Sequence, residues 1–352
     1  MHTQLPFVAV VILSWNGKKY LQQFLPALLR TTYPNARFYV ADNASGDGTD
    51  AFVREHFPSV HLLRLQKNNG FAGGYNLALA QIEADYYVLL NQDVEVTPGW
   101  IEPVVSLMQA DSLIAAAQPK IRAFHQRSFF EYAGAAGGFL DRHGFAFCRG
   151  RFFNMVEEDH GQYDEETEIV WATGAALFIK ANIFHRLGGL DADFFAHFEE
   201  IDLCWRIKNA GYKVYCCPRS VVYHVGGGSL PPTNPRKTYL NYRNNLSAIV
   251  KNTTGSQLFP VLLVRLLLDI LSALKLLFTG KVQDFLAVLR AHAFFITHLH
   301  QLLGKRKEAW CVVHMHRIGV PNRKGFYRGS IIWAHFVEGK NCFSELLREK
   351  FF

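Results

Sequence analysis

Paired cysteines and a targeting segment are both missing from this 352-residue chain. Its six cysteines form no C-x-x-C pair and show no metal-ligand spacing, which argues against a disulfide framework or a zinc site. A reducing compartment is the simpler interpretation. The N-terminus has no basic segment followed by an apolar stretch and a cleavage site, so we expect no signal peptide.

Two common phosphate-binding motifs are also missing. The chain has no G-x-x-x-x-G-K-[ST] sequence, and no G-x-G-x-x-G follows its first predicted strand. A P-loop kinase and a nicotinamide-dependent enzyme are therefore disfavoured. The composition, 49% hydrophobic and 19% charged, predicts a packed core. The length suggests roughly two domains, or one large α/β domain with an appendage.

The first hundred residues alternate between strand and helix patterns. We expect strands at 7–14, 37–41, 60–65 and 86–90, and helices at 18–31 and 72–83. This order is typical of βαβ units, which form a mostly parallel central sheet with helices on both faces. Further on, the patterns predict a strand at 169–180, a helix at 194–209, and short strands at 213–217 and 221–223.

Charge is distributed unevenly between the two parts of the chain. From Arg236 onward there are 18 Lys/Arg against 6 Asp/Glu, whereas the remainder has 19 against 24. This asymmetry indicates an anionic partner, for which a membrane surface and a nucleic acid are both candidates. The basic residues are interspersed with long Leu/Phe runs, which favours a lipid surface.

Residues 258–280 come near the length of a bilayer span, but Arg265, Asp269 and Lys275 interrupt them. On a helical wheel these residues form a narrow polar stripe beside a wide apolar face, which is compatible with a helix lying in the membrane interface. Residues 285–303 have a similar character. Alternatively, these helices pack on the rest of the protein or on a second subunit, or residues 258–280 span a bilayer.

A strand pattern at residues 86–90 ends in the polar residues Asn91, Gln92, Asp93 and Glu95. In open α/β sheets ligands bind just beyond the carboxyl ends of the strands. Oxygen ligands placed there suit Mg²⁺ or Mn²⁺, which add waters and phosphate oxygens. The segment is therefore either half of a metal–diphosphate site or a polar exit from the strand without a ligand.

Two loops could contact a nucleotide. Asp42 ends the second predicted strand, where an acid can accept hydrogen bonds from a nucleobase or ribose, although a simple Asx-turn explains the same residues. The glycines in residues 68–76 (NNGFAGGYN) allow close approach of a ligand at a helix N-terminus. A tight strand-to-helix turn is the alternative.

Three acids, Glu199, Glu200 and Asp202, fall within one helical turn among apolar residues. Partial burial raises a carboxyl pKa and would improve one of them as a general base. Salt bridges to the basic residues that follow explain the same pattern. His224 could be a metal ligand or a structural histidine.

In this order, the segments resemble family 2 glycosyltransferases of the GT-A fold, especially bacterial rhamnosyltransferase-like members. The matching segments, within about residues 6–250, are VVILSWNGKKYL, ADNASGDGT, NNGFAGGYNLAL, LLNQDVEV, WATGAALFIKANIFHRLGGLDADFFAHFEEIDLCWRIKNAGY and YHVGGGS. The resemblance implies a Rossmann-like α/β catalytic domain at 1–235, with a nucleotide-binding half at about 1–110 and an acceptor-binding half at about 111–235. A basic helical region at 236–352 follows.

The resemblance also implies roles for individual residues. Glu200 would be the general base, with Glu199 beside it assisting in acceptor binding, and Asp93 and His224 would hold Mg²⁺ or Mn²⁺. Contacts to the nucleotide-sugar are implied at Asp42, Asn43, Asn69, Gly70, Gly73, Asn76 and Asn91. The chain departs from the family pattern twice: Asn91 replaces the first Asp of Asp-x-Asp, and Glu200 stands where Asp is usual. The choice between Glu199 and Glu200 therefore stays open.

We expect a metal-dependent, inverting hexosyltransferase that uses a dTDP-rhamnose-like or UDP-hexose donor. Its acceptor would be a hydroxyl of a glycan, lipid-linked, in cell-surface polysaccharide synthesis at the cytoplasmic face of the inner membrane. A homodimer stays open, and nucleic acid is not an expected partner. The alternatives are a catalytically weak GT-A-like scaffold or binding protein at the membrane, and a sugar-phosphate nucleotidyltransferase.

Overall fold

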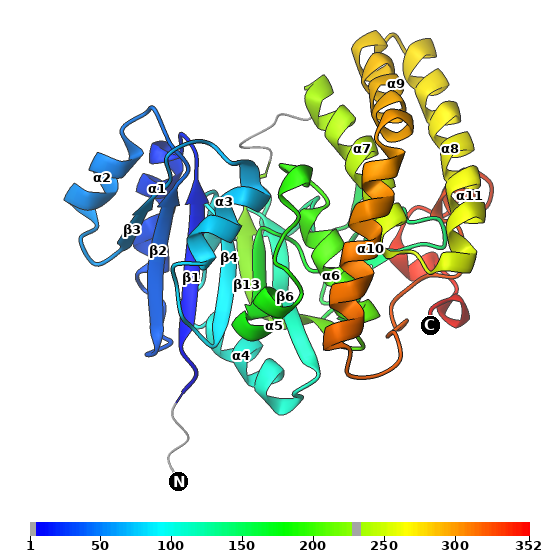
Figure 1. Ribbon diagram of the computed structural model, residues 1–352. Coiled ribbons are helices and arrows are strands. Elements are labelled where there is room, and N and C mark those ends of the chain that lie inside the picture. Colours follow the sequence, from blue (N-terminus) through cyan, green and yellow to red (C-terminus); the bar gives the residue numbers. More distant parts are fainter. Residues whose placement is uncertain (1–4, 227–233) are drawn as a thin grey trace.

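The computed structural model describes residues 5–226 and 234–352 (Figure 1). The strands of its main sheet are β1 (Val8–Ser14), β2 (Ala36–Asp42), β3 (His61–Arg64), β4 (Tyr86–Asn91), β5 (Val94–Val96), β6 (Ile114–Ala123), β11 (Thr167–Ile169), β12 (Ala176–Lys180) and β13 (Lys213–His224). The order in this nine-stranded sheet is β11-β13-β6-β12-β4-β1-β2-β3, and β5 pairs with β13.

The strands at one side of the sheet run parallel to one another. Strand β1 lies between β2 and β4 and is parallel to both, and β3 extends the same parallel set beyond β2. Strand β12 is antiparallel to its neighbours β4 and β6, so the sheet is mixed. The parallel register sets Ser14 beside Asp42, and Leu13 beside Asn91. The carboxyl ends of β1, β2 and β4 therefore meet at one edge.

Helices cover both faces of the sheet, because alternate residues of β1 belong to two different cores. Val8, Val10 and Ile12 share one core with residues of α1 (Lys18–Leu28), α2 (Thr49–His56) and α4 (Ile101–Ala110). Ala9 and Val11 share the other core with residues of α3 (Gly70–Leu79), α5 (Ala181–Arg186) and α6 (Glu199–Asn209). The predicted α/β fold is confirmed.

Two of the strand predictions were wrong in detail. The strand predicted at 169–180 is interrupted between β11 and β12, where the N–H of Thr173 donates to a glutamine side chain rather than to a neighbouring strand. The short strands predicted at 213–217 and 221–223 are one strand, β13, whose register with β6 shifts around Pro218. Proline has no N–H to donate to a ladder, so it is expected at such an irregularity.

A small antiparallel sheet, of order β10-β9-β8-β7, lies beside the main sheet. Its strands are β7 (Gly138–Leu140), β8 (Ala146–Cys148), β9 (Arg151–Phe152) and β10 (Met155–Val156). The C-terminal segment packs on it: Tyr327 bridges to Asp141 and to Phe351, and its ring lies 6.0 Å from that of Phe147. Short 3₁₀ turns are η1 (Ala192–Phe194), η2 (Phe343–Glu345) and η3 (Arg348–Lys350).

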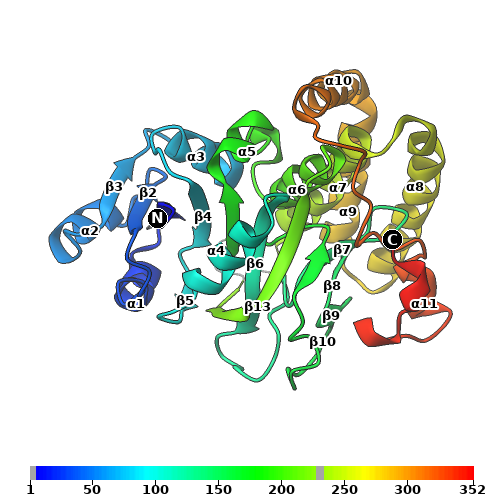
Figure 2. The ribbon, with the colours of Figure 1, turned by 90° about the horizontal axis from the view of Figure 1, so that it is seen from below.

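The C-terminal part is helical, as predicted. Its helices are α7 (Pro235–Asn252), α8 (Gly255–Phe278), α9 (Val282–Thr297), α10 (Leu299–His316) and α11 (Ile331–Phe336). Helix α8 lies at the outer edge of the molecule, at the opposite end from α2 (Figures 1 and 2). None of the helices in the described ranges combines the length and the apolar composition needed to cross a bilayer. A domain boundary at residue 235 stays a prediction.

Candidate active site

The loops after β2 and before α3 are tied together by Asn43, which is buried. Its Nδ2 donates to the carbonyl of Gly70 over 3.0 Å, and its Oδ1 accepts from the N–H of Asn69 over 3.0 Å. Gly70 has a φ of 69°, and a Cβ there would lie 2.6 Å from the ring of Phe195. Only glycine fits this close approach. The carbonyl of Phe195 also accepts from the N–H of Phe71 over 2.6 Å, which joins this loop to the segment before α6.

Asp42 is buried at the end of β2, and its Oδ1 accepts from the N–H of Ser45 over 3.1 Å. The Asx-type turn considered from the sequence is therefore present. Asn76 lies further along α3, and both ends of its amide bond to the backbone of Leu190, at 2.6 and 3.0 Å. This contact docks α3 on the segment before η1. A Cβ on Gly73 would lie 3.1 Å from the Cβ of Asn69, so this turn is tightly packed.

Asp93 and His224 are 131 residues apart in the chain but lie together where β5 pairs with the end of β13. Asp93 Oδ1 is 3.2 Å from His224 Nε2, and both side chains are buried. On the opposite side of the imidazole, Glu131 Oε1 lies 3.4 Å from Nδ1. Asn91 Nδ2 approaches Nε2 at 3.4 Å. The residue that sequence reasoning missed is Glu131, because its segment carries no recognisable motif.

The two carboxylates control the charge of the imidazole. Burial alone would lower the pKa of His224, but Glu131 and Asp93 on either side outweigh burial and raise this pKa to about 10. Burial would likewise raise the pKa of Asp93, and the neighbouring His224 reverses this effect, so the pKa is lowered. Asp93 is therefore ionised at neutral pH, as a metal-binding carboxylate must be.

The donor set at this point fits a hard divalent cation. Among the described residues, no group of three or more His, Cys, Asp and Glu side chains could by itself hold a metal ion. Asp93 and, once a bound cation has displaced its proton, His224 would offer an incomplete shell, which suits a cation that also takes phosphate oxygens and waters. Glu131 on the far nitrogen of the imidazole matches the carboxylate–histidine arrangement that orients metal-ligating histidines.

The second group of functional candidates stands at the start of α6. The helix predicted at 194–209 begins only at Glu199, because Phe195, His197 and Phe198 have φ values of 62°, 71° and 73°. Such values are rare for bulky residues and end the helical pattern. The strain must be offset by surrounding contacts, and strained backbone of this kind clusters at functional sites.

Glu199 is buried and Glu200 is half-buried, and the Oε2 atom of each is buried without a hydrogen-bond partner among the described residues. Burial raises the pKa of Glu200 to about 7, although backbone N–H groups, including that of Gly174, lower it in part. The pKa of Glu199 is raised well above its usual value by burial first and then by Glu200. The carbonyl of Ala175, next to Gly174, accepts from the N–H of Asn91, so Glu200 lies close to the end of β4.

The third acid of this turn has a structural role. Asp202 is fully buried and pairs with Arg206 and with Lys251 of α7, each at 2.9 Å. Lys208 pairs elsewhere, with Glu168 at 2.6 Å. The salt-bridge explanation considered from the sequence therefore holds for Asp202 and not for the two glutamates. The Asp202 network fixes α6 to the C-terminal helices.

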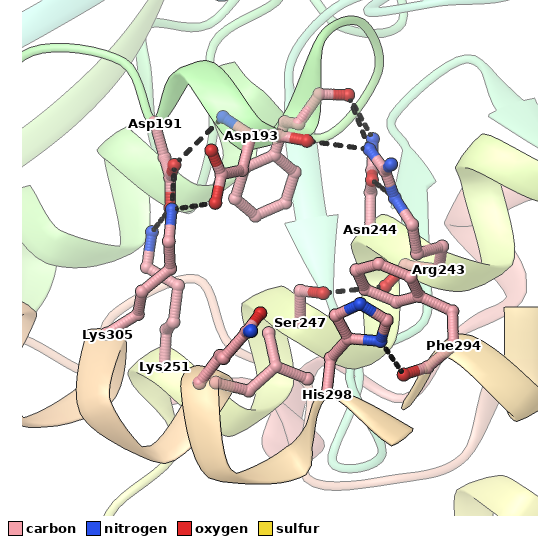
Figure 3. A pocket seen from close by; sticks show the side chains of 12 residues that line it. Asp191, Asp193, Arg243, Asn244, Ser247, Lys251, Phe294, His298 and Lys305 are labelled. Atoms are coloured by element: carbon pink, nitrogen blue, oxygen red, sulfur yellow. Dashed lines mark hydrogen bonds and ion pairs between the residues drawn. The ribbon is translucent and has the colours of Figure 1, made fainter. Parts of the chain in front are cut away.

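Helix α7 holds the strained segment in place (Figure 3). Asn244, which is 1% exposed, points its Nδ2 at the carbonyls of Phe194, Ala196 and His197, at 3.0, 2.9 and 2.6 Å. Arg243 donates to the carbonyl of Phe194 over 2.9 Å. The cavity between these elements has a volume of ≈ 40 Å³, room for about one water molecule and not for a sugar. We therefore regard this cavity as a packing gap between the elements that border it, and not as a ligand-binding site.

The fold of this chain is that of the GT-A glycosyltransferases. The solved mannosyltransferase PcManGT of Pyrobaculum calidifontis, in complex with GDP-Man and Mn²⁺, superposes with a TM-score of 0.51. The match covers 89% of this chain and 88% of that structure at 15% sequence identity, so it shows the likeness of fold alone.

Sequence comparisons point to the same class of protein. A model of glycosyl transferase family 2 matches residues 9–167. N-acetylglucosaminyl-diphospho-decaprenol L-rhamnosyltransferase of Mycobacterium tuberculosis is 26% identical over 236 residues, which cover 62% of this chain and 75% of that protein. Rhamnosyltransferase WbbL of Escherichia coli is 24% identical over 239 residues, 62% of this chain and 83% of that protein. The chain is therefore similar to family 2 glycosyltransferases and, among them, to rhamnosyltransferases.

Proposed function

We propose that this protein is a metal-dependent, inverting glycosyltransferase with Glu200 as its general base. The observation that carries the proposal is that two groups of titratable side chains lie near the end of β4. Asp93 and His224 would form a partial cation shell, and Glu200 has a buried carboxylate oxygen without a hydrogen-bond partner in the described ranges and a pKa of about 7. A base with a pKa near the working pH is the most effective at taking a proton.

In this proposal the donor lies over the loops after β2 and before α3, with its diphosphate toward Asp93 and its base toward Asp42. When bound, Mg²⁺ or Mn²⁺ would neutralise the charge of the leaving nucleoside diphosphate. Glu200 takes the proton of the acceptor hydroxyl while the oxygen attacks the anomeric carbon and the bond to the diphosphate oxygen breaks. One displacement inverts the configuration. Glu199, which is more deeply buried, holds the acceptor.

Three further residues support these groups. Glu131, with Oε1 3.4 Å from His224 Nδ1, would hold the ring by charge attraction so that Nε2 faces Asp93. Asn244 and Arg243 fix the carbonyls of the segment that precedes Glu200. In this proposal α7 contributes to the site, so the C-terminal region would act together with the catalytic domain.

The relatives support a place in cell-surface glycan synthesis. One is named as acting on a diphospho-decaprenol acceptor, and both are named rhamnosyltransferases. We propose a dTDP-rhamnose-like or UDP-hexose donor and a lipid-linked glycan acceptor, reached from the cytoplasmic face of the membrane. The proposal does not require a dimer.

Calorimetric titration with dTDP and UDP, with and without Mn²⁺, tests the donor site. We expect Mn²⁺-dependent binding that is lost in Asp93→Ala and kept in Leu113→Ala, a change at an exposed residue of the α4–β6 loop. Nucleotide binding that depends neither on Mn²⁺ nor on Asp93 would contradict the assignment.

Inversion is tested by intact-protein mass spectrometry during turnover, in which a covalent sugar–protein adduct would overturn the single-displacement mechanism.

A further inference from the structure

Helix α8 turns its polar side toward the protein and its apolar side toward solvent. Arg265 and Asp269 are 5% and 1% exposed, whereas Phe259 and Phe278 are 77% and 84% exposed. Between these phenylalanines, the other large exposed side chains of the helix are Leu263, Leu267, Ile270, Leu271, Leu274 and Leu277. A surface helix of a water-soluble protein normally shows the opposite arrangement.

Polar contacts fix α8 in this orientation. Arg265 Nε donates to Asp269 Oδ1 over 2.8 Å, and the guanidinium lies 3.7 Å from the ring centre of Phe145. Ser272, one turn further on, hydrogen-bonds to the hydroxyl of Tyr242 on α7 over 2.6 Å. Arg265, Asp269 and Ser272 therefore face the protein, whereas Lys275, at the end of the predicted polar stripe, is exposed. Rotating α8 to bury its leucines would expose this buried ion pair and leave its partners unmatched.

The apolar surface continues onto α11, which lies beside the end of α8 (Figure 2). Trp333, Phe336 and Val337 are each more than half exposed, and Lys275 Nζ of α8 lies 5.1 Å from the ring centre of Phe336. Lys275 and Lys281 are exposed at this end of the surface. We call the exposed apolar residues of α8 and α11, with these lysines, the α8–α11 surface.

We propose that the α8–α11 surface docks on an anionic lipid bilayer, with α8 lying in the interface. Aromatic and leucine side chains enter the boundary between headgroups and acyl chains, while lysines at the rim attract anionic headgroups. The charge of the C-terminal region, 18 basic against 6 acidic residues, complements such a surface. A second copy of this chain fits less well, because its C-terminal region carries the same excess of basic residues and offers no complementary charge.

This inference deepens the proposed function, since a lipid-linked acceptor would be met at that bilayer. Vesicle binding needs no sugar transfer, so the two proposals can fail separately. The experiment is flotation of the full-length protein with vesicles of phosphatidylglycerol and phosphatidylcholine, or of phosphatidylcholine alone. Leu267→Asp is the test variant. Leu113→Asp is the matched control, because it places the same charge on a partly exposed leucine away from α8.

We expect wild type and Leu113→Asp to float with the anionic vesicles, less with neutral ones, and less again at high salt. Leu267→Asp should bind on the order of tenfold more weakly or worse, since it removes one inserted leucine and adds a charge. Equal binding by all three proteins would overturn the proposal, as would no binding to any vesicle. Light scattering tests the alternative that the surface joins two copies of the chain. If wild type is a dimer that Leu267→Asp dissociates, and neither protein binds vesicles, the surface is a contact with a second copy.

Discussion

Replacing Asn244 by alanine should damage both stability and catalysis, because this residue clamps the strained segment before Glu200. Its amide has two N–H groups to share among three buried carbonyls, those of Phe194, Ala196 and His197. Two bonds are therefore lost, and the carbonyls they served stay buried. At about 1–2 kcal/mol for each lost bond with its unsatisfied partner, the free energy of unfolding should fall by about 2–4 kcal/mol.

The expected catalytic effect follows from geometry. Freed from the clamp, the backbone at His197 can relax from its positive φ and move the start of α6. A displacement of about 1 Å at a catalytic group can lower kcat by about 10²-fold. Urea denaturation gives the change in stability, and steady-state sugar transfer gives kcat for the same preparation.

Asn245 provides the matched control. It is equally buried on the same helix, but its Nδ2 donates to the carbonyl of Gly144 over 2.8 Å, far from the strained segment in sequence and contact. Asn245→Ala should lose stability by about 1–2 kcal/mol with kcat little changed. The reasoning would be refuted if Asn244→Ala kept the kcat of wild type, or if both variants lost kcat equally.

Three further predictions follow from the site. The value of kcat/KM should rise about tenfold per pH unit below pH 7 and level off above it, because Glu200, with a pKa of about 7, must be deprotonated to act as base. A pH profile of kcat/KM without this rise would show that Glu200 is not the general base. Glu200→Gln should lower kcat by about 10²–10⁴-fold, whereas Glu199→Gln should mainly raise the KM for the acceptor, and steady-state kinetics with the reverse pattern would exchange the two roles. Glu131→Gln should keep the fold but weaken Mn²⁺ binding by about 10–100-fold, measured by titration of the metal in the presence of nucleotide. An unchanged affinity for Mn²⁺ would show that Glu131 does not orient His224.

The sequence predicted the parts of the site that lie in regular elements or in recognisable segments. The sequence patterns put Asp42 and Asn91 each at the end of a predicted strand, and the resemblance put Asp93 with His224. Glu131 could not be predicted, because its only signal is its distance from an imidazole far away in the chain. Asn244 lies in a helix beyond the expected catalytic domain, so no local pattern connects it with Glu200.

Local propensity failed where tertiary contacts decide. The residues of segment 194–198 are apolar and spaced like a helix, yet the carbonyl clamp of Asn244 and the close approach of Gly70 hold them in another conformation. Helix α8 shows a related gap. Its amphipathic pattern predicted two faces correctly but could not tell which one meets the protein, because the buried partners of Arg265 and Ser272 lie on other elements.

The most direct test of the central claim is turnover of a donor panel by the purified full-length protein. The panel contains dTDP-rhamnose, UDP-glucose, UDP-galactose and GDP-mannose, each with Mn²⁺ and with EDTA, and release of nucleoside diphosphate is measured. We predict that one donor is turned over only with the metal, and that Asp93→Ala and Glu200→Gln abolish turnover while Leu113→Ala keeps it. If Glu200→Gln or Asp93→Ala retains the full rate, the role assigned to that residue is contradicted. If no donor is turned over, the scaffold function becomes the better explanation of the fold.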